Sequence, residues 1–138
     1  LSARGAESLA RGGVAAGLLP IASFTLGQAA PDIALLRAHG VRLLVASDAN
    51  PGTAPTESLP LALALAARNY GLTLEEAILG VTREAARSLG LDDTGRIAEG
   101  KAADLVLWDL PHEAALLEPW GSPKTRRVWR DGAQLLIR

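Results

Sequence analysis

Two short apolar runs, each preceded by a stretch that favours helix, constrain this chain more than any other feature. Residues 3–11 are rich in Ala, Leu and Arg and precede the run 14–19. A second predicted helix opens at Pro31, ends near Gly40 and precedes the run 41–46. Runs of this length bounded by Gly and Pro predict buried strands. This alternation is typical of a parallel sheet with helical crossovers, whose strands are buried on both faces.

The downstream sequence divides into a helical part and a small β part. Residues 21–29 are expected to form a loop between the first strand and the second helix. Three further helices are predicted after the second strand: at about 56–69, from a capping box of Thr73 and Glu76 to near Gly80, and from Thr82 as the cap to Ser88. The character changes near residue 92. A strand is predicted at 104–108, and a hairpin from 125–129 through a turn at 131–132 to 134–137.

The composition narrows the classes of partner. Hydrophobic residues make up 49% and charged residues 21%, which indicates a globular chain. Fourteen Lys and Arg nearly balance fifteen Asp and Glu, so no basic surface for nucleic acid or an anionic membrane is expected. No apolar stretch is long enough to span a membrane, and cysteines are absent. We therefore expect a cytoplasmic protein with a small-molecule ligand.

Asp48 directly follows the second apolar run. Sites in parallel α/β proteins are built at the carboxyl edge of the sheet, where this residue is expected to lie. A carboxylate is costly to bury there without a partner. One interpretation is a metal ligand or a general base. The other is an Asp that caps the following turn through hydrogen bonds to its own backbone. Position alone leaves both open.

The segment Asn50-Pro51-Gly52-Thr53 comes next and is predicted to be a turn. Pro fixes one dihedral angle, Gly permits close approach of the backbone, and Asn and Thr bring polar side chains. Such a turn can present N–H groups and a hydroxyl to a ligand, although most turns of this composition bind nothing. We therefore treat these four residues as a candidate binding element.

The two histidines are not expected to form a site. His39 precedes Gly40 at a predicted helix end, where an imidazole commonly meets the last carbonyl groups. His112 lies in the later β part. No His-x-His, Ser/His/Asp order or phosphate-binding glycine motif is present. Trp108, Trp120 and Trp129 are expected in the core or at an interface.

The run from Gly95 to Asp109, GRIAEGKAADLVLWD, resembles the closing signature of the amidohydrolase superfamily. Within that superfamily, residues 47–53 (SDANPGT) resemble the strand-8 motif of imidazolonepropionases, with Ser47 in place of the usual Thr. The resemblance covers essentially the whole chain. It implies an α/β fold in which residues 1–92 form the C-terminal part of a (β/α)8 TIM barrel. Residues 93–138 would then supply strands of a small composite β-sandwich.

The resemblance also implies roles for individual residues. Asp48 would be the carboxylate ligand of a single Zn²⁺ or Fe³⁺ ion and a catalytic residue. Asn50 and Gly52 would contact polar groups of the substrate and product, and Thr53 the imidazolone ring. The implied reaction is hydrolysis of 4-imidazolone-5-propanoate to N-formimidoyl-L-glutamate. The metal would acidify the attacking water, and Asp48 would move its proton to the departing ring nitrogen. The full-length enzyme is expected to be a homodimer.

The chain lacks the histidines that complete the metal site in this family. A catalytic metal needs about three protein ligands, and one carboxylate cannot hold it. The sequence also begins with Leu and contains no methionine. We therefore expect a C-terminal fragment that is inactive alone, either truncated or completed by another chain. Two alternatives are another amidohydrolase, such as a cytosine or guanine deaminase relative, and a non-catalytic structural fragment. The Asn-Pro-Gly turn argues against the deaminase.

Overall fold

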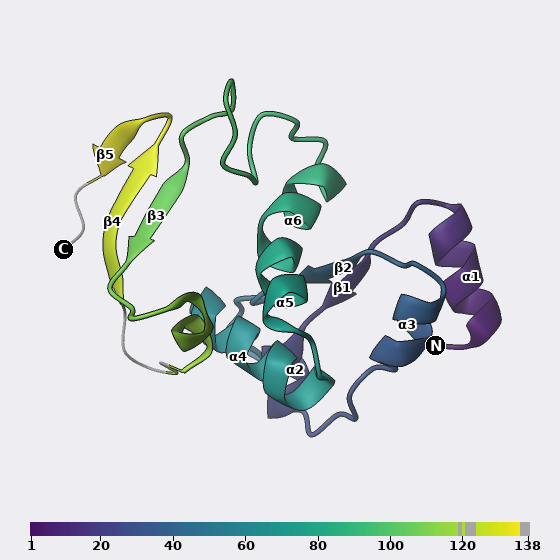
Figure 1. Cartoon of the computed structure of the whole chain (residues 1–138). Coiled ribbons are helices and arrows are strands. Elements are labelled where there is room, and N and C mark those ends of the chain that lie inside the picture. Colours follow the sequence, from purple (N-terminus) through teal and green to yellow (C-terminus); the bar gives the residue numbers. More distant parts are fainter. Residues whose placement is uncertain (119, 121–123, 136–138) are drawn as a thin grey trace.

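Helices and strands alternate through the first half of the chain and give way to a small antiparallel sheet (Figure 1). The computed structural model describes residues 1–118, 120 and 124–135. Its elements are α1 (Ala3–Arg11), β1 (Ala16–Leu18), α2 (Pro20–Thr25), α3 (Ile33–Ala38), β2 (Leu43–Val45), α4 (Leu59–Tyr70), α5 (Leu74–Val81), α6 (Arg83–Ser88), β3 (Leu105–Trp108), the 3₁₀ helix η1 (Glu113–Leu117), β4 (Thr125–Arg130) and β5 (Ala133–Leu135). No helix of the described residues is long and apolar enough to cross a membrane.

Strands β1 and β2 pair in parallel, as predicted, but only one face of this sheet is buried. Leu18 pairs with Val45, and both are buried. Gly17 pairs with Leu44 on the opposite face, where Gly17 is exposed and Leu44 is half-buried. The prediction of burial on both faces is therefore wrong for this chain. The physical reason is that α4, α5 and α6 all contact β2, while the face of Gly17 is left uncovered.

The core forms between the sheet and α4, whose residues 62–66 are all buried. Helix α5 packs most closely on β2 because Gly80 has no side chain. A Cβ at Gly80 would lie 3.2 Å from the Leu43 carbonyl oxygen and 3.3 Å from the Val45 nitrogen. The backbone of the helix thus rests directly on the backbone of the strand. This contact fixes the strand from which Asp48 extends.

Several predicted boundaries need correction. The loop expected at 21–29 is wrong, because residues 20–25 form α2. Pro20 occupies the first turn of this helix, where its missing N–H costs nothing, and Ile21 is buried. Helix α3 begins at Ile33 rather than Pro31, since the Asp32 carboxylate accepts a hydrogen bond from the Leu35 N–H at 2.8 Å. Ser58 caps α4 in the same way, so that helix begins at residue 59 rather than near 56.

Of the two helix caps predicted for α5 and α6, one is confirmed and the other is wrong. The capping box of Thr73 and Glu76 is confirmed, with both reciprocal hydrogen bonds present. Thr82 occupies the N-cap position of α6, but its side chain makes no capping hydrogen bond. Its hydroxyl instead donates to the Ile78 carbonyl at 2.7 Å and closes the end of α5. The expected capping role of the Thr82 side chain is therefore wrong.

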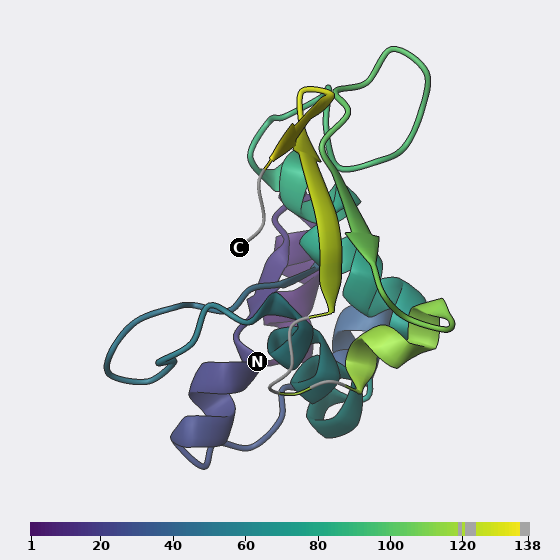
Figure 2. The same ribbon diagram turned by 90° about the vertical axis from the view of Figure 1, so that its left-hand side faces the viewer.

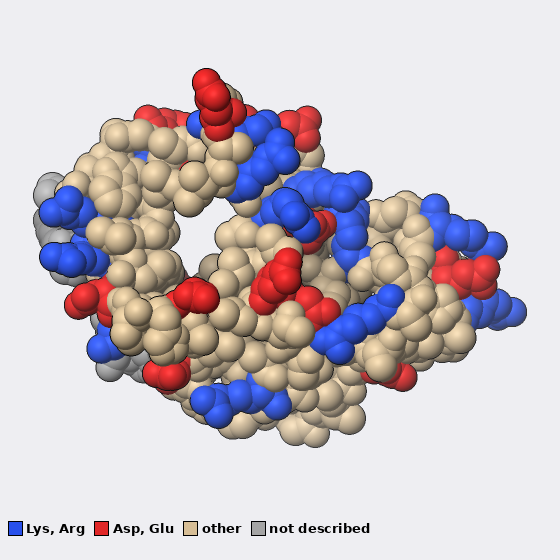
Figure 3. Space-filling model, in the orientation of Figure 1, with Lys and Arg blue, Asp and Glu red and all other residues tan. Residues whose placement is uncertain are grey.

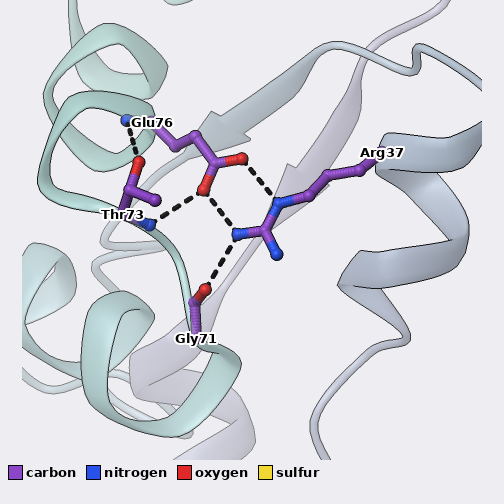
Figure 4. A network of polar contacts seen from close by, with 4 residues as sticks. All are labelled: Arg37, Gly71, Thr73 and Glu76. Atoms are coloured by element: carbon purple, nitrogen blue, oxygen red, sulfur yellow. Dashed lines mark hydrogen bonds and ion pairs between the residues drawn. The ribbon is translucent and has the colours of Figure 1, made fainter.

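An ion pair joins α3 to the start of α5 (Figure 4). The guanidinium of Arg37 donates from Nε and Nη2 to the two carboxylate oxygens of Glu76, at 2.7 and 2.6 Å. The same Nη2 donates to the Gly71 carbonyl, and Glu76 also accepts from the Thr73 N–H. The hydrogen bonds from Arg37 hold the pKa of the Glu76 carboxyl below its usual value. The ion pair thus links the capping box of α5 to helix α3.

A second polar contact lies at the amino end of β2. The Arg42 guanidinium donates to the Gly13 carbonyl, in the connection between α1 and β1. Its Nη1 lies 3.9 Å from Glu84 Oε2 on α6, and Glu84 also pairs with Arg83 at 2.9 Å. Both facing atoms of Arg42 and Glu84 are buried without a hydrogen bond. Arg42 therefore ties the amino end of the strand to two neighbouring segments.

The later β unit is a three-stranded antiparallel sheet in the order β3-β4-β5. The predicted hairpin is confirmed, with Asp131 and Gly132 at positive φ in its turn. Its predicted second strand reaches residue 137, and residues 136–137 lie outside the described ones. Helix η1 packs on α4, and the Arg68 guanidinium lies 5.9 Å from the Trp120 ring centroid. Figure 3 shows an opening between this sheet and the helices.

Candidate functional site

Asp48 lies in the loop that leaves the carboxyl end of β2, as the sequence predicted. This loop, residues 46–58, projects from the body of the molecule (Figure 2). The Asp48 side chain is exposed, and it forms no ion pair with any described residue. Its backbone has a φ of 53°. Few residues other than glycine adopt this left-handed conformation, although Asp tolerates it better than most.

The turn after Asp48 is organised by Asn50 rather than by Asp48. The Asn50 Oδ1 accepts hydrogen bonds from the N–H groups of Gly52 and Thr53, at 2.9 and 2.8 Å. Its Nδ2 donates to the Asp48 carbonyl at 2.6 Å. Among the described residues, no backbone N–H donates to the Asp48 carboxylate. The interpretation of Asp48 as a turn cap is therefore wrong. Within the described part of the chain, its carboxylate accepts one long hydrogen bond, from Asn50 Nδ2 to Oδ2 at 3.4 Å.

Gly52 and Thr53 complete the turn. A Cβ at Gly52 would lie 3.4 Å from Asn50 Oδ1, which is an ordinary van der Waals contact. The Thr53 hydroxyl lies 3.1 Å from Asn50 Nδ2. The Asn50 N–H donates to the Ala54 carbonyl at 2.9 Å, and Ala54 is fully buried. The turn is thus anchored to the core through Ala54.

A hollow of about 520 Å³ lies beside this turn and opens widely to solvent. It is lined by residues 49–51 and 54–57, so both arms of the loop contribute to it. Glu57 is the one charged side chain in that lining, and the sequence analysis did not single it out. The four predicted site residues lie together in the loop that forms this hollow. Of these four, only Asn50 lines the hollow, and the N–H groups of Gly52 and Thr53 donate to the Asn50 Oδ1 rather than into it.

The histidines lie away from this loop in helix caps, as expected for His39. His39 Nδ1 lies 2.9 Å from the Leu35 carbonyl oxygen at the end of α3. His112 Nδ1 accepts a hydrogen bond from the Ala115 N–H at the start of η1. Over residues 1–118, 120 and 124–135, no group of three or more His, Cys, Asp or Glu side chains could hold a metal ion. A metal site at Asp48 would therefore need ligands from outside the described residues.

Comparison with known proteins defines the class of this chain. The sequence model of the Amidohydrolase family matches residues 2–135. The chain belongs to the amidohydrolase family. The resemblance predicted from residues 95–109 is thereby confirmed.

Among the relatives, the imidazolonepropionases are similar to nearly the whole chain. That of Mesorhizobium japonicum is 46% identical over 129 residues, which covers 91% of this chain and 32% of the relative. That of Cereibacter sphaeroides is 50% identical over 84% of this chain and 30% of its own length. The imidazolonepropionase of Caulobacter vibrioides is 47% identical over 94% of this chain and 33% of its own length. The chain thus spans about a third of these curated relatives.

Solved structures confirm the fold. An adenosine deaminase from Xanthomonas campestris with bound zinc superposes with a TM-score of 0.88 at 23% identity, over 99% of this chain and 35% of that protein. An amidohydrolase from Thermotoga maritima gives a TM-score of 0.76 at 27% identity, over 99% and 35%. The first of these likenesses concerns the fold alone. Both proteins share the α/β arrangement of this chain.

Proposed function

We propose that this chain is the C-terminal part of an imidazolonepropionase, which hydrolyses 4-imidazolone-5-propanoate to N-formimidoyl-L-glutamate. The observation that carries the proposal is the segment 47–53, SDANPGT, which forms an ordered turn at the carboxyl end of β2. The similarity to imidazolonepropionases at 45–50% identity over most of the chain supports it. A homodimeric, cytoplasmic full-length enzyme without nucleic-acid or membrane partners belongs to the same proposal.

In this proposal, residues 1–92 complete a (β/α)8 barrel and residues 93–138 contribute strands to a small β-sandwich. The one-sided burial of the β1–β2 sheet supports the first part. Helices cover the face of Leu18 and Val45, whereas the face of Gly17 and Leu44 is open. An open face of this kind fits the interior of a barrel that other strands close. Val106 and Leu107 support the second part, because they lie on opposite faces of β3, both are exposed, and a second sheet packed on either face would cover one of them.

The proposed cofactor is one Zn²⁺ or Fe³⁺ ion, with Asp48 as its carboxylate ligand. The exposed, unpaired carboxylate fits a first-row metal because oxygen ligands of this kind bind such ions, and its remaining ligands would come from residues outside this chain. A bound metal of this kind lowers the pKa of water towards about 7 and polarises a carbonyl group. The zinc printed for the adenosine deaminase supports a metal but not its identity.

The residues of this chain would divide the remaining work. Asp48 would accept the proton of the attacking water and deliver it to the ring nitrogen that departs as the C–N bond breaks. Asn50 and Gly52 would contact the polar groups of substrate and product, and Thr53 the imidazolone ring. In the turn, the Thr53 hydroxyl is half-buried and Gly52 is exposed. The exposed backbone at Gly52 suits contact with a polar group, because it carries no side chain.

The direct test is an assay of the full-length protein that carries this segment. We expect it to open the ring of 4-imidazolone-5-propanoate and to contain one metal ion per subunit by elemental analysis. The isolated chain 1–138 should be inactive with the same substrate and metal. Deamination of cytosine or guanine without ring opening would replace this proposal with the deaminase alternative. Absence of both activities and of metal would favour a non-catalytic structural role.

A further inference from the structure

The Asn50 side chain uses both of its polar ends within the loop. Its Oδ1 accepts from the N–H groups of Gly52 and Thr53, and its Nδ2 donates to the Asp48 carbonyl and lies 3.1 Å from the Thr53 hydroxyl. An amide has two donor hydrogens and two acceptor lone pairs. Nδ2 also lies 3.4 Å from Asp48 Oδ2, and Oδ1 lies 3.3 Å from the Thr53 hydroxyl, so six contacts within the loop share these two donors and two acceptors. The side chain therefore has little capacity left for a direct hydrogen bond to a substrate.

The contact with Asp48 constrains a residue in an unusual conformation. Asp48 has a φ of 53°, which for a residue with a side chain persists only when its surroundings hold it there. The Asn50 Nδ2 donates to the Asp48 carbonyl at 2.6 Å, which fixes the orientation of the following peptide group. The same nitrogen lies 3.4 Å from Asp48 Oδ2. One amide group thus contacts both the backbone and the carboxylate of the proposed ligand.

The main chain of Asn50 is anchored in the core. The Asn50 N–H pairs with the carbonyl of Ala54, which is fully buried and belongs to the main hydrophobic cluster. Asp48 is therefore joined to the core on two sides, directly by the chain from β2 and through Asn50 and Ala54. The loop around it is otherwise exposed, as at Pro51 and Gly52. Without the Asn50 amide, little in the described structure would keep Asp48 left-handed.

We propose that Asn50 is a positioning residue for Asp48: its side chain holds the Asp48 carboxylate at the proposed metal, and only its main chain is left to contact substrate. This inference deepens the proposed function and rests on Asp48 as a metal ligand. A misdirected ligand weakens metal binding and slows the proton transfer, while the substrate pocket keeps its shape. Loss of an outer contact of this kind typically lowers metal affinity or activity by 10–100-fold.

The experiment compares Asn50→Ala and Asn50→Ser in the metal-loaded full-length protein. Ser keeps a short acceptor for the turn N–H groups but cannot reach the Asp48 carbonyl, so it separates folding of the turn from positioning. We expect both variants to raise the metal dissociation constant about 10–100-fold, measured by chelator competition. In both, kcat should fall by a similar factor while KM changes less than about threefold. Glu7→Gln, on helix α1 outside this loop, is the control and should alter neither quantity.

A double-mutant cycle with Asp48→Ala tests directly whether Asn50 acts through Asp48. If Asn50 acts through Asp48, Asn50→Ala should not weaken metal binding further once Asp48 is removed. Additive losses would overturn the inference, as would a raised KM with unchanged metal affinity, which would make Asn50 a direct substrate contact. A crystal structure of Asn50→Ser with Asp48 still left-handed and unmoved would also overturn it.

The cycle separates this inference from the proposed function. A wild-type protein that binds metal but does not open the imidazolone ring, yet shows the coupling, refutes the function and keeps the inference. A wild-type protein that opens the ring but shows additive losses keeps the function and refutes the inference. A full-length protein that binds no metal refutes both.

Discussion

The polar residues at the two ends of strand β2 differ in their contacts and in their exposure to solvent. At the amino end, Arg42 is tied to the Gly13 carbonyl and faces Glu84, with the facing atoms buried. At the carboxyl end, the turn satisfies its own polar groups through Asn50 and leaves the Asp48 carboxylate exposed and unpaired. One end joins segments of the fold together, and the other keeps a charge available. This division matches parallel α/β barrels, in which one face serves stability and the other chemistry.

The largest effect is expected at the carboxyl end. Asp48→Asn in the full-length enzyme should lower the rate of imidazolone ring opening by at least about 10²–10⁴-fold, because an amide cannot accept the proton of water. Thermal unfolding should change little, since Asp48 is exposed and forms no ion pair among the described residues. Steady-state kinetics and melting curves measure the two quantities. Ring opening at the wild-type rate would refute the role of Asp48 and remove the contrast between the two ends.

A substitution on α5, opposite the middle of β2, tests whether the close approach of this helix holds the strand in place. Gly80→Ala should destabilise the protein by about 1–2 kcal/mol, since overpacking outweighs the helix propensity of Ala. The new Cβ would lie 3.2–3.3 Å from backbone atoms of Leu43 and Val45, which cannot move aside easily. Denaturant unfolding of the purified protein measures this change.

Gly5→Ala, in α1, is the matched control for that substitution. Its Cβ would meet the end of the exposed Leu1 side chain, which can move aside, so helix propensity should prevail. We expect Gly5→Ala to be neutral or stabilising. Equal effects of the two substitutions would show that the close approach of α5 to β2 does not matter.

Part of this structure could be predicted from local signals. The capping box of Thr73 and Glu76 identified its helix, and the apolar runs identified both parallel strands. The position of Asp48 after the second run located the candidate site. Helix α2 was missed because Pro20 was taken as the end of a strand rather than as the first residue of a helix. That signal was present in the sequence.

Other features could not be predicted because they depend on partners distant in sequence. Burial on one face of the sheet depends on which helices pack against it, and the period of a short apolar run does not reveal this. The contact of Arg42 with Glu84 joins residues that have no common local pattern. The role of Asn50 lies between these cases. An Asn two residues before a Gly favours a turn of this kind, but its hydrogen bond to the Asp48 carbonyl required the folded loop.

The amino end of β2 should respond with stability rather than activity. Arg42→Met keeps an apolar stem of similar length but removes the hydrogen bond to Gly13 and the charge opposite Glu84. We expect a loss of about 1 kcal/mol in unfolding free energy, mainly from the lost hydrogen bond to Gly13, because Glu84 keeps its ion pair with Arg83. The kcat of ring opening should stay within about twofold. Glu7→Gln, which removes an exposed ion pair with Arg11, is the control and should cost less than about 0.5 kcal/mol.

Should Arg42→Met lower kcat while leaving stability unchanged, the division between the two ends would fail. In that outcome the amino end of the strand would influence the site directly. Equal losses of stability in Arg42→Met and Glu7→Gln would instead show that burial of the Arg42 contact adds nothing.

The smallest effect concerns the ion pair of Arg37 and Glu76, which lies away from both ends of β2. Hydrogen bonds from Arg37 lower the pKa of the Glu76 carboxyl in the folded protein. A carboxyl with a lowered pKa stabilises the fold above its unfolded pKa of about 4.3 and loses this effect as the pH falls through the folded value. Glu76→Gln removes the charge but keeps an acceptor for the capping box.

We therefore expect Glu76→Gln to lower the melting temperature at pH 7 by at most a few degrees, because both side chains of the pair are partly exposed to solvent. The difference from the wild type should shrink as the pH falls below about 4.3 and vanish at lower pH, where Glu76 is protonated in both states. Melting curves of both proteins between pH 7 and pH 2 measure it. A constant difference across that range would show that Glu76 stabilises the fold through its hydrogen bonds rather than its charge. Of the ion pairs Arg42–Glu84 and Arg37–Glu76, only the first would then stabilise the fold through charge. That result would make the charged contact at the amino end of β2 more distinctive.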